Sequence, residues 1–93
     1  MLLVFSVYDS KAEAYGRPFF LTSDGLAMRA FMEAVQSQEH DFAKWPADYT
    51  LFRIGSYDEH SGKLAGLDAF VSLGTGVEYK GDVGQLELVK EQK

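Results

Sequence analysis

Aromatic and cationic side chains are concentrated just after the first apolar run of the chain. The segment from residue 11 to residue 20 contains Lys11, Tyr15, Arg17, Phe19 and Phe20. Single-stranded nucleic acid is bound by such combinations, because the cations follow the phosphate backbone while bases stack on the rings. Each stacked base contributes about 1–3 kcal/mol. This segment is therefore the first candidate site for binding nucleic acid.

A second combination of the same kind lies further along the chain. Lys44 and Trp45 precede Tyr49, and Arg53 follows on a predicted strand. Arg29, on a predicted helix, completes the set of candidate nucleic-acid contacts. We expect these residues to contribute to a binding face only if folding brings their charges and rings to the same side of the molecule.

Each of these side chains also has a purely structural explanation. Trp45 in so small a protein is expected to cover the core rather than to stack on a base. Arg29 has Glu33 four residues later, and side chains at this spacing on a helix form ion pairs. Phe19 and Phe20 cannot both be buried in an extended segment, because adjacent side chains point to opposite faces.

The sequence contains little that could catalyse a reaction or hold a metal ion. There is no cysteine, no G-x-S-x-G turn and no phosphate-binding loop. His40 and His60 have acidic neighbours but lack the fixed spacing of a zinc or iron site. We therefore predict a binding protein rather than an enzyme, with no catalytic residues, no metal and no cofactor.

The composition indicates a single small domain with an acidic surface. The chain has 93 residues, of which 46% are hydrophobic, and a formal net charge of −5. Acidity opposes binding to phosphates, although Arg17, Arg29 and Arg53 are all in the first 53 residues. The lack of cysteine and of a long apolar run favours a cytoplasmic protein without a membrane span. A core this small makes a homodimer a reasonable expectation.

The pattern of apolar and turn residues predicts an α+β fold, with one main helix on a small, mainly antiparallel sheet. These elements must position the candidate residues. The predicted order is β-α-β-β: a central strand at 2–9, a helix at 24–38 capped by Ser23 and Asp24, and a hairpin of strands 50–57 and 63–67. Phe5, Phe31 and Phe52 are expected in the core. Residues 19–21 are a strand or a packed loop, 40–49 a connection, 68–79 a short helix or strand, 85–89 a last strand and 90–93 a flexible tail. The uncovered face or an unpaired edge of the sheet is the expected contact surface.

Three blocks of residues carry a family resemblance over roughly residues 3–80. They are VYDSKA followed by Tyr15 and RPFF; the helix with Ala27, Arg29 and Phe31; and PADYTLFRIG followed by Tyr57-Asp58 and Ser61-Gly62-Lys63. In this order the chain resembles the small nonstructural protein of gokushovirus-type microviruses, which are single-stranded DNA phages. The resemblance implies a DNA-binding or replication-control role when the phage turns to synthesis and packaging of single strands. It implies no catalytic residues.

Two functions follow from these observations. In the first, the protein binds single-stranded DNA or the replication complex in the cytoplasm of the host bacterium. In the second, it is a protein-interaction or assembly regulator that binds phage or host replication proteins and does not contact DNA. The resemblance favours the first function, and the acidic charge favours the second. A clustered basic and aromatic face would support DNA binding, whereas an exposed apolar patch without nearby cations would support protein binding.

Overall fold

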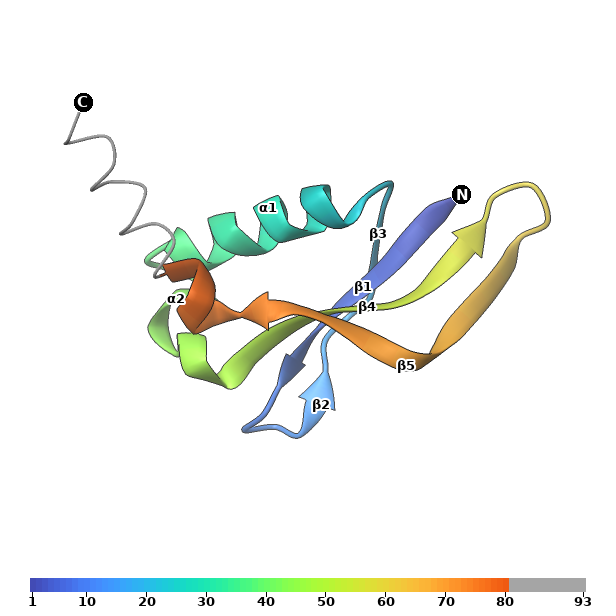
Figure 1. Cartoon of the computed structure of the whole chain (residues 1–93). Coiled ribbons are helices and arrows are strands. Elements are labelled where there is room, and N and C mark those ends of the chain that lie inside the picture. Colours follow the sequence, from blue (N-terminus) through green and yellow to red (C-terminus); the bar gives the residue numbers. More distant parts are fainter. Residues whose placement is uncertain (81–93) are drawn as a thin grey trace, which may run out of the picture.

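The first strand, β1 (Leu2–Asp9), is apolar on both faces and lies inside the sheet, as predicted. In the computed structural model, which describes residues 1–80, the strand order is β2-β1-β4-β5. The short strands β2 (Ala14–Tyr15) and β3 (Phe19–Leu21) both pair with the same edge of β1, at its end and its start respectively. All pairings are antiparallel, so the predicted fold class is confirmed (Figure 1).

The predicted hairpin is formed by β4 (Tyr49–Asp58) and β5 (Lys63–Thr75). The turn between them is closed by Gly62, whose φ of +74° favours glycine. The register shifts between Arg53 and Gly55, which pair with Val71 and Gly66 respectively. Residues 67–70 therefore form a bulge on β5, and Figure 1 shows the strand bending sharply along its length.

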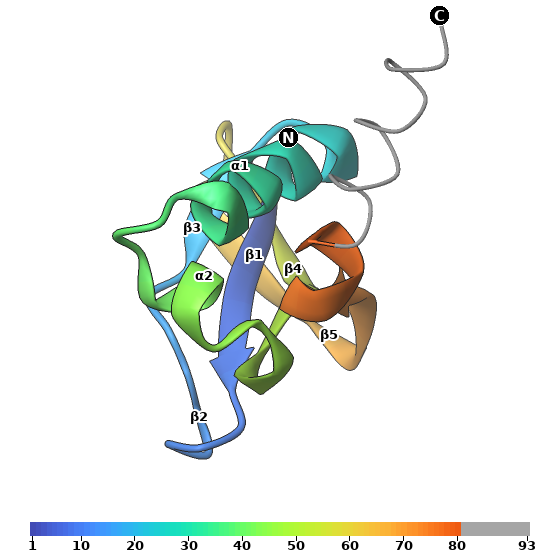
Figure 2. The ribbon, with the colours of Figure 1, turned by 90° about the vertical axis from the view of Figure 1, so that its left-hand side faces the viewer.

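The main helix, α1 (Asp24–Gln36), begins at the predicted residue and ends slightly before the predicted one. The Ser23 hydroxyl caps the helix by accepting a hydrogen bond from the Leu26 N–H at 3.2 Å. Ala27, Phe31 and Val35 recur at helical spacing and are buried. This stripe lies against one face of the sheet, which α1 covers (Figure 2).

The connection predicted at 40–49 contains two short helical segments, α2 (Asp41–Lys44) and η1 (Pro46–Asp48). The alternatives for 68–79 are also settled: β5 continues to Thr75, and residues 76–80 are helical. The predicted strand at 85–89 and the tail at 90–93 lie outside the described residues. Within residues 1–80, no helix has the length and apolar character needed to cross a membrane.

The core lies between α1 and the sheet and is built around Phe5, Phe31 and Leu51, each at most 2% exposed. Tyr79 completes it, and its hydroxyl donates a 2.7 Å hydrogen bond to the Leu73 carbonyl. The prediction of a core role was correct for Phe5 and Phe31 and wrong for Phe52. Phe52 is only half-buried, because strand alternation places its neighbour Leu51 in the core instead.

Candidate functional site

Aromatic rings gather on the face of the sheet that α1 does not cover. The ring centroid of Tyr15 lies 4.8 Å from that of Tyr8, 5.9 Å from Phe52 and 5.5 Å from Phe70. These residues come from β2, β1, β4 and β5, so the cluster crosses the whole sheet. Tyr15 is 46% exposed and Phe70 is 44% exposed. The cluster is thus an uncovered surface.

A second ring pair extends this surface along the strands. The centroids of Phe20 and Tyr57 lie 5.8 Å apart in an edge-to-face arrangement, and Phe20 is 41% exposed. Between the ring groups lies a hollow of about 330 Å³. We call the combined surface the open face, and it comprises Val4, Tyr8, Tyr15, Pro18, Phe20, Phe52, Ile54, Tyr57, Leu64 and Phe70.

Strand alternation explains why these residues share a face. Phe52 lies between Leu51, which is in the core, and Arg53, which reaches α1, so its ring must point the other way. On β5, Leu64 and Phe70 both line the hollow. Gly66 lines it too, so Leu64, Gly66 and Phe70 lie on the same side of the sheet although the bulge at residues 67–70 interrupts the regular alternation of β5.

None of the residues that form the open face is charged, and exposed charges lie along both edges of the sheet. Asp68 is exposed on β5, two residues before Phe70. At the opposite edge of the sheet, Arg17 is exposed next to Pro18, between β2 and β3. The surface is therefore apolar in the middle, with an acidic group at one edge and a basic group at the other.

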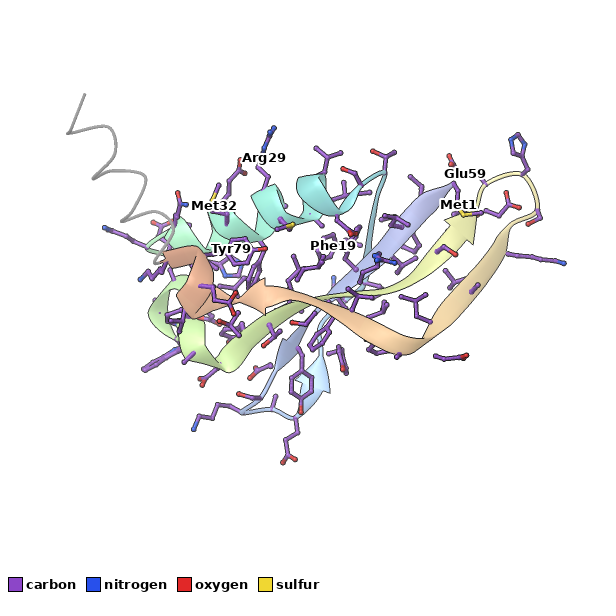
Figure 3. All side chains as sticks on the ribbon, in the orientation of Figure 1. Met1, Phe19, Arg29, Met32, Glu59 and Tyr79 are labelled. Atoms are coloured by element: carbon purple, nitrogen blue, oxygen red, sulfur yellow. The ribbon has the colours of Figure 1, made fainter. Side chains whose placement is uncertain are left out.

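The first predicted segment divides between this face and the core. Tyr15 and Phe20 lie on the open face, and the exposed Lys11 and Arg17 lie in the loops before and after β2. Phe19 points to the other side and stacks on Phe5 with ring centroids 5.7 Å apart. Figure 3 shows Phe19 between α1 and the sheet. Phe19 is partly buried against the core and Phe20 is exposed, so the prediction that the two cannot both be buried is confirmed.

The two candidates Arg29 and Arg53 lie on the helix side of the sheet. Arg29 is exposed on α1 and points away from the sheet (Figure 3). Within residues 1–80 no ion pair joins it to Glu33, so that expectation was wrong. The Arg53 Nε lies 3.0 Å from an Asp24 carboxylate oxygen, and both atoms are shielded from water. This contact connects β4 to the first turn of α1 and keeps the Arg53 charge from the open face.

The remaining candidates, Lys44, Trp45 and Tyr49, form a corner at the end of α2. Trp45 is 61% exposed, so the expectation that it covers the core was wrong. Phe42 has that role, since its ring lies 5.5 Å from Phe31 and 4.5 Å from Tyr49, centroid to centroid.

The electrostatic surroundings of this corner are acidic. Partial burial and the neighbouring carboxylates of Asp9, Asp41 and Asp48 raise the pKa of the Tyr49 hydroxyl above its usual value of 10.0. Each of these carboxylates opposes a phosphate group nearby. Lys44 is the exposed cation on the short helix that ends here. The corner is therefore a poor match for nucleic acid despite its exposed tryptophan.

The structure thus distributes the predicted nucleic-acid contacts over the open face, the core, the outer side of α1 and the acidic corner. The sequence prediction also missed Tyr8, Phe52, Tyr57 and Phe70, which supply most of the exposed ring surface. The alternation of Phe52 with its core neighbour Leu51 was a usable signal, since it marks the two faces of one strand. On β5, Gly66 and the short predicted hairpin concealed the position of Phe70.

Two further features lie away from the open face. A smaller apolar hollow of about 200 Å³ lies between α1, α2 and the sheet, lined by Val7, Phe19, Ala30, Phe31, Ala34 and Phe42. His40 caps α2, because its Nδ1 accepts a 3.1 Å hydrogen bond from the Phe42 N–H. Among residues 1–80, no group of His, Asp and Glu side chains is arranged to hold a metal ion.

Comparison with known proteins identifies a family. The protein family described as Phage ORF5 protein matches residues 2–79, which include the segment from the start of β1 to the end of β5. No curated protein and no solved structure matches the chain significantly.

Proposed function

The chain belongs to the phage ORF5 protein family, and we propose that it is a protein-interaction module whose contact surface is the open face. One observation carries the proposal: exposed aromatic rings lie together on this face, and none of the residues that form it is charged. Contiguous exposed apolar surface of this kind marks protein contacts in soluble proteins. Tyrosine and phenylalanine are also enriched at protein interfaces. We place the module inside the infected bacterial cell, as an assembly or replication regulator.

The distribution of charge favours protein over DNA as the direct partner. Affinity for nucleic acid depends on several cations that neutralise adjacent phosphates at once. Here Arg53 is paired with Asp24, and Arg29 lies on the far side of α1. The net charge of −5 adds long-range repulsion of a polyanion.

Binding of single-stranded DNA is the second candidate, and a specific observation favours it. Tyr15 and Phe20 are exposed on an open sheet, and Lys11 and Arg17 lie in the adjoining loops. Flat rings beside a few cations suit base stacking. This candidate corresponds to the gokushovirus-type nonstructural protein, acting on the phage genome or the replication complex in the switch to single-strand synthesis and packaging.

The protein-binding proposal is tested with the proteins of the same phage and of the host replication machinery, each purified separately. Binding to fluorescently labelled wild type is compared with Phe70→Ser, which removes a ring from the open face. Met28→Ser is the matched control, since Met28 is 37% exposed on α1 and Phe70 44% exposed on the sheet. We expect binding that Phe70→Ser abolishes and Met28→Ser preserves. Equal binding by both variants would show that the open face is not the contact surface.

The DNA candidate is tested by fluorescence anisotropy with a single-stranded oligonucleotide at low and high salt. Direct binding predicts an affinity that falls steeply with salt and is lost in the Lys11→Ala/Arg17→Ala double variant. A Lys63→Ala variant is the control, because Lys63 is an exposed cation at the hairpin turn. Weak signals that are equal in all proteins and insensitive to salt exclude DNA binding through this edge.

A further inference from the structure

We infer that the open face is occupied by a second copy of this chain, packed face to face with the two sheets aligned. The inference rests on the proposed function and names the partner of the same surface. It follows from the exposed area of the face and from the charges at its two edges.

The exposed area is of the size that an interface core needs. Tyr15, Phe20 and Phe70 are 46%, 41% and 44% exposed. Since an aromatic side chain has roughly 200 Å² of surface, these rings together expose about 250 Å². Leu64, which is 64% exposed, enlarges the patch to the size of the largest apolar patches on monomers, which are often functional. A partner of standard size covers about 800 Å² on each side, so a polar rim would surround this apolar centre.

The charge distribution suits a second copy better than it suits another strongly charged partner. Two copies with a net charge of −5 each repel one another over most of their surfaces. The open face is where they can approach, because none of the residues that form it carries a charge. Two exposed charges of opposite sign lie at its opposite edges: Arg17 lies beside β3, and Asp68 lies on β5.

With a two-fold axis parallel to the strands, the opposite charges at the two edges of the open face become complementary between the two copies. Rotation about such an axis places the β3 edge of one copy over the β5 edge of the other. The edge that carries Arg17 in each copy then lies over the edge that carries Asp68 in its partner, and this arrangement occurs twice in the dimer. Isologous interfaces of this type are the commonest in soluble homo-oligomers, and aligned packing is one of the two ways in which sheets stack.

The test is a reciprocal charge exchange, measured by sedimentation of the full chain. Both substitutions are at exposed positions, so all variants are expected to fold. We expect a wild-type dimer that Arg17→Asp or Asp68→Arg weakens by at least about tenfold, since each change places like charges together twice. The Arg17→Asp/Asp68→Arg double variant should recover dimerisation to within about threefold of wild type. Arg29→Asp, on the outer side of α1, is the control and should leave the dimer unchanged.

Two results would overturn the inference. One is a wild-type chain that stays monomeric at concentrations up to about 100 μM. The other is a double variant that dimerises no more tightly than the weaker of the two single variants. The proposed function fails differently. If the chain is monomeric but Phe70→Ser still abolishes binding of a phage or host protein, only the second copy is excluded. If Phe70→Ser alters neither association, the open face is not a contact surface at all.

Discussion

Replacing Phe20 with serine removes one exposed ring from the open face without adding a charge. Phe20 is 41% exposed and contacts Tyr57 edge to face at the end of the hollow. Because β3 pairs with β1 through backbone hydrogen bonds, the strand itself does not depend on this ring. The variant should therefore fold, and circular dichroism and thermal unfolding verify that it does.

The expected loss of association is calculated from the exposed area. A phenylalanine side chain has roughly 200 Å² of surface, so the exposed 41% corresponds to about 80 Å². At about 25 cal/mol per Å², covering that area stabilises a complex by about 2 kcal/mol, or about thirtyfold in affinity. In a symmetric dimer the substitution acts twice, which doubles the loss to about 4 kcal/mol, or about a thousandfold.

Sedimentation equilibrium of wild type, Phe20→Ser and Met28→Ser measures this loss directly. Met28→Ser is the control because Met28 lies on α1 and is 37% exposed, close to the value for Phe20. A difference between the two variants of about thirtyfold or more assigns the contact to the open face. Identical dissociation constants for all three proteins would refute the reasoning, because a ring covered in the complex cannot be lost without cost.

Further predictions concern the interactions that hold the sheet and helix in place. A Cβ at Gly55 would lie 2.3 Å from the carbonyl oxygen of Ala65, so Gly55→Ala should destabilise the fold by about 3 kcal/mol in urea unfolding. Asp24→Asn leaves the Arg53 guanidinium without its charge partner and should cost about 1 kcal/mol; the added change Arg53→Met should recover most of that loss. The pKa of Tyr49 is raised above 10.0 by burial and by nearby carboxylates, so the folded state holds this proton more strongly than the unfolded state. The contribution of Tyr49 to the free energy of unfolding is therefore fully present below pH 10.0 and is lost as the pH rises toward and through the pKa of the folded state. Denaturation curves at alkaline pH should show a smaller loss of stability for Tyr49→Phe than for wild type.

Local patterns in the sequence were sufficient for the elements that local interactions determine. Ser23 caps α1 as its side chain predicts, and the helix buries Phe31, as expected. Phe19 and Phe20 divide between core and surface because alternation is a property of the extended backbone. These predictions needed no knowledge of which segments become neighbours.

The features that were missed depend on contacts between distant residues. The length of β5 could not be predicted, since Gly66 and Gly74 weaken any local strand signal and pairing with β4 determines the outcome. Trp45 was misplaced because Phe42 already fills the position over the core. The pairing of Arg53 with Asp24 connects elements that are far apart in sequence, so no spacing rule reveals it.

The two edges of the sheet explain why the open face, rather than strand addition, is the surface on which association should occur. One edge is divided into the two-residue β2 and the three-residue β3, with Pro18 between them lacking an N–H to donate. The other edge is β5, which bulges at residues 67–70 and bends. Short strands, proline and bulges all oppose pairing with the strand of another chain. The two contact surfaces expected for such a sheet are an unpaired edge and the uncovered face. Both edges are protected against strand pairing, whereas the open face keeps its exposed rings. Substitutions on that face are accordingly the most direct way to alter what the protein binds.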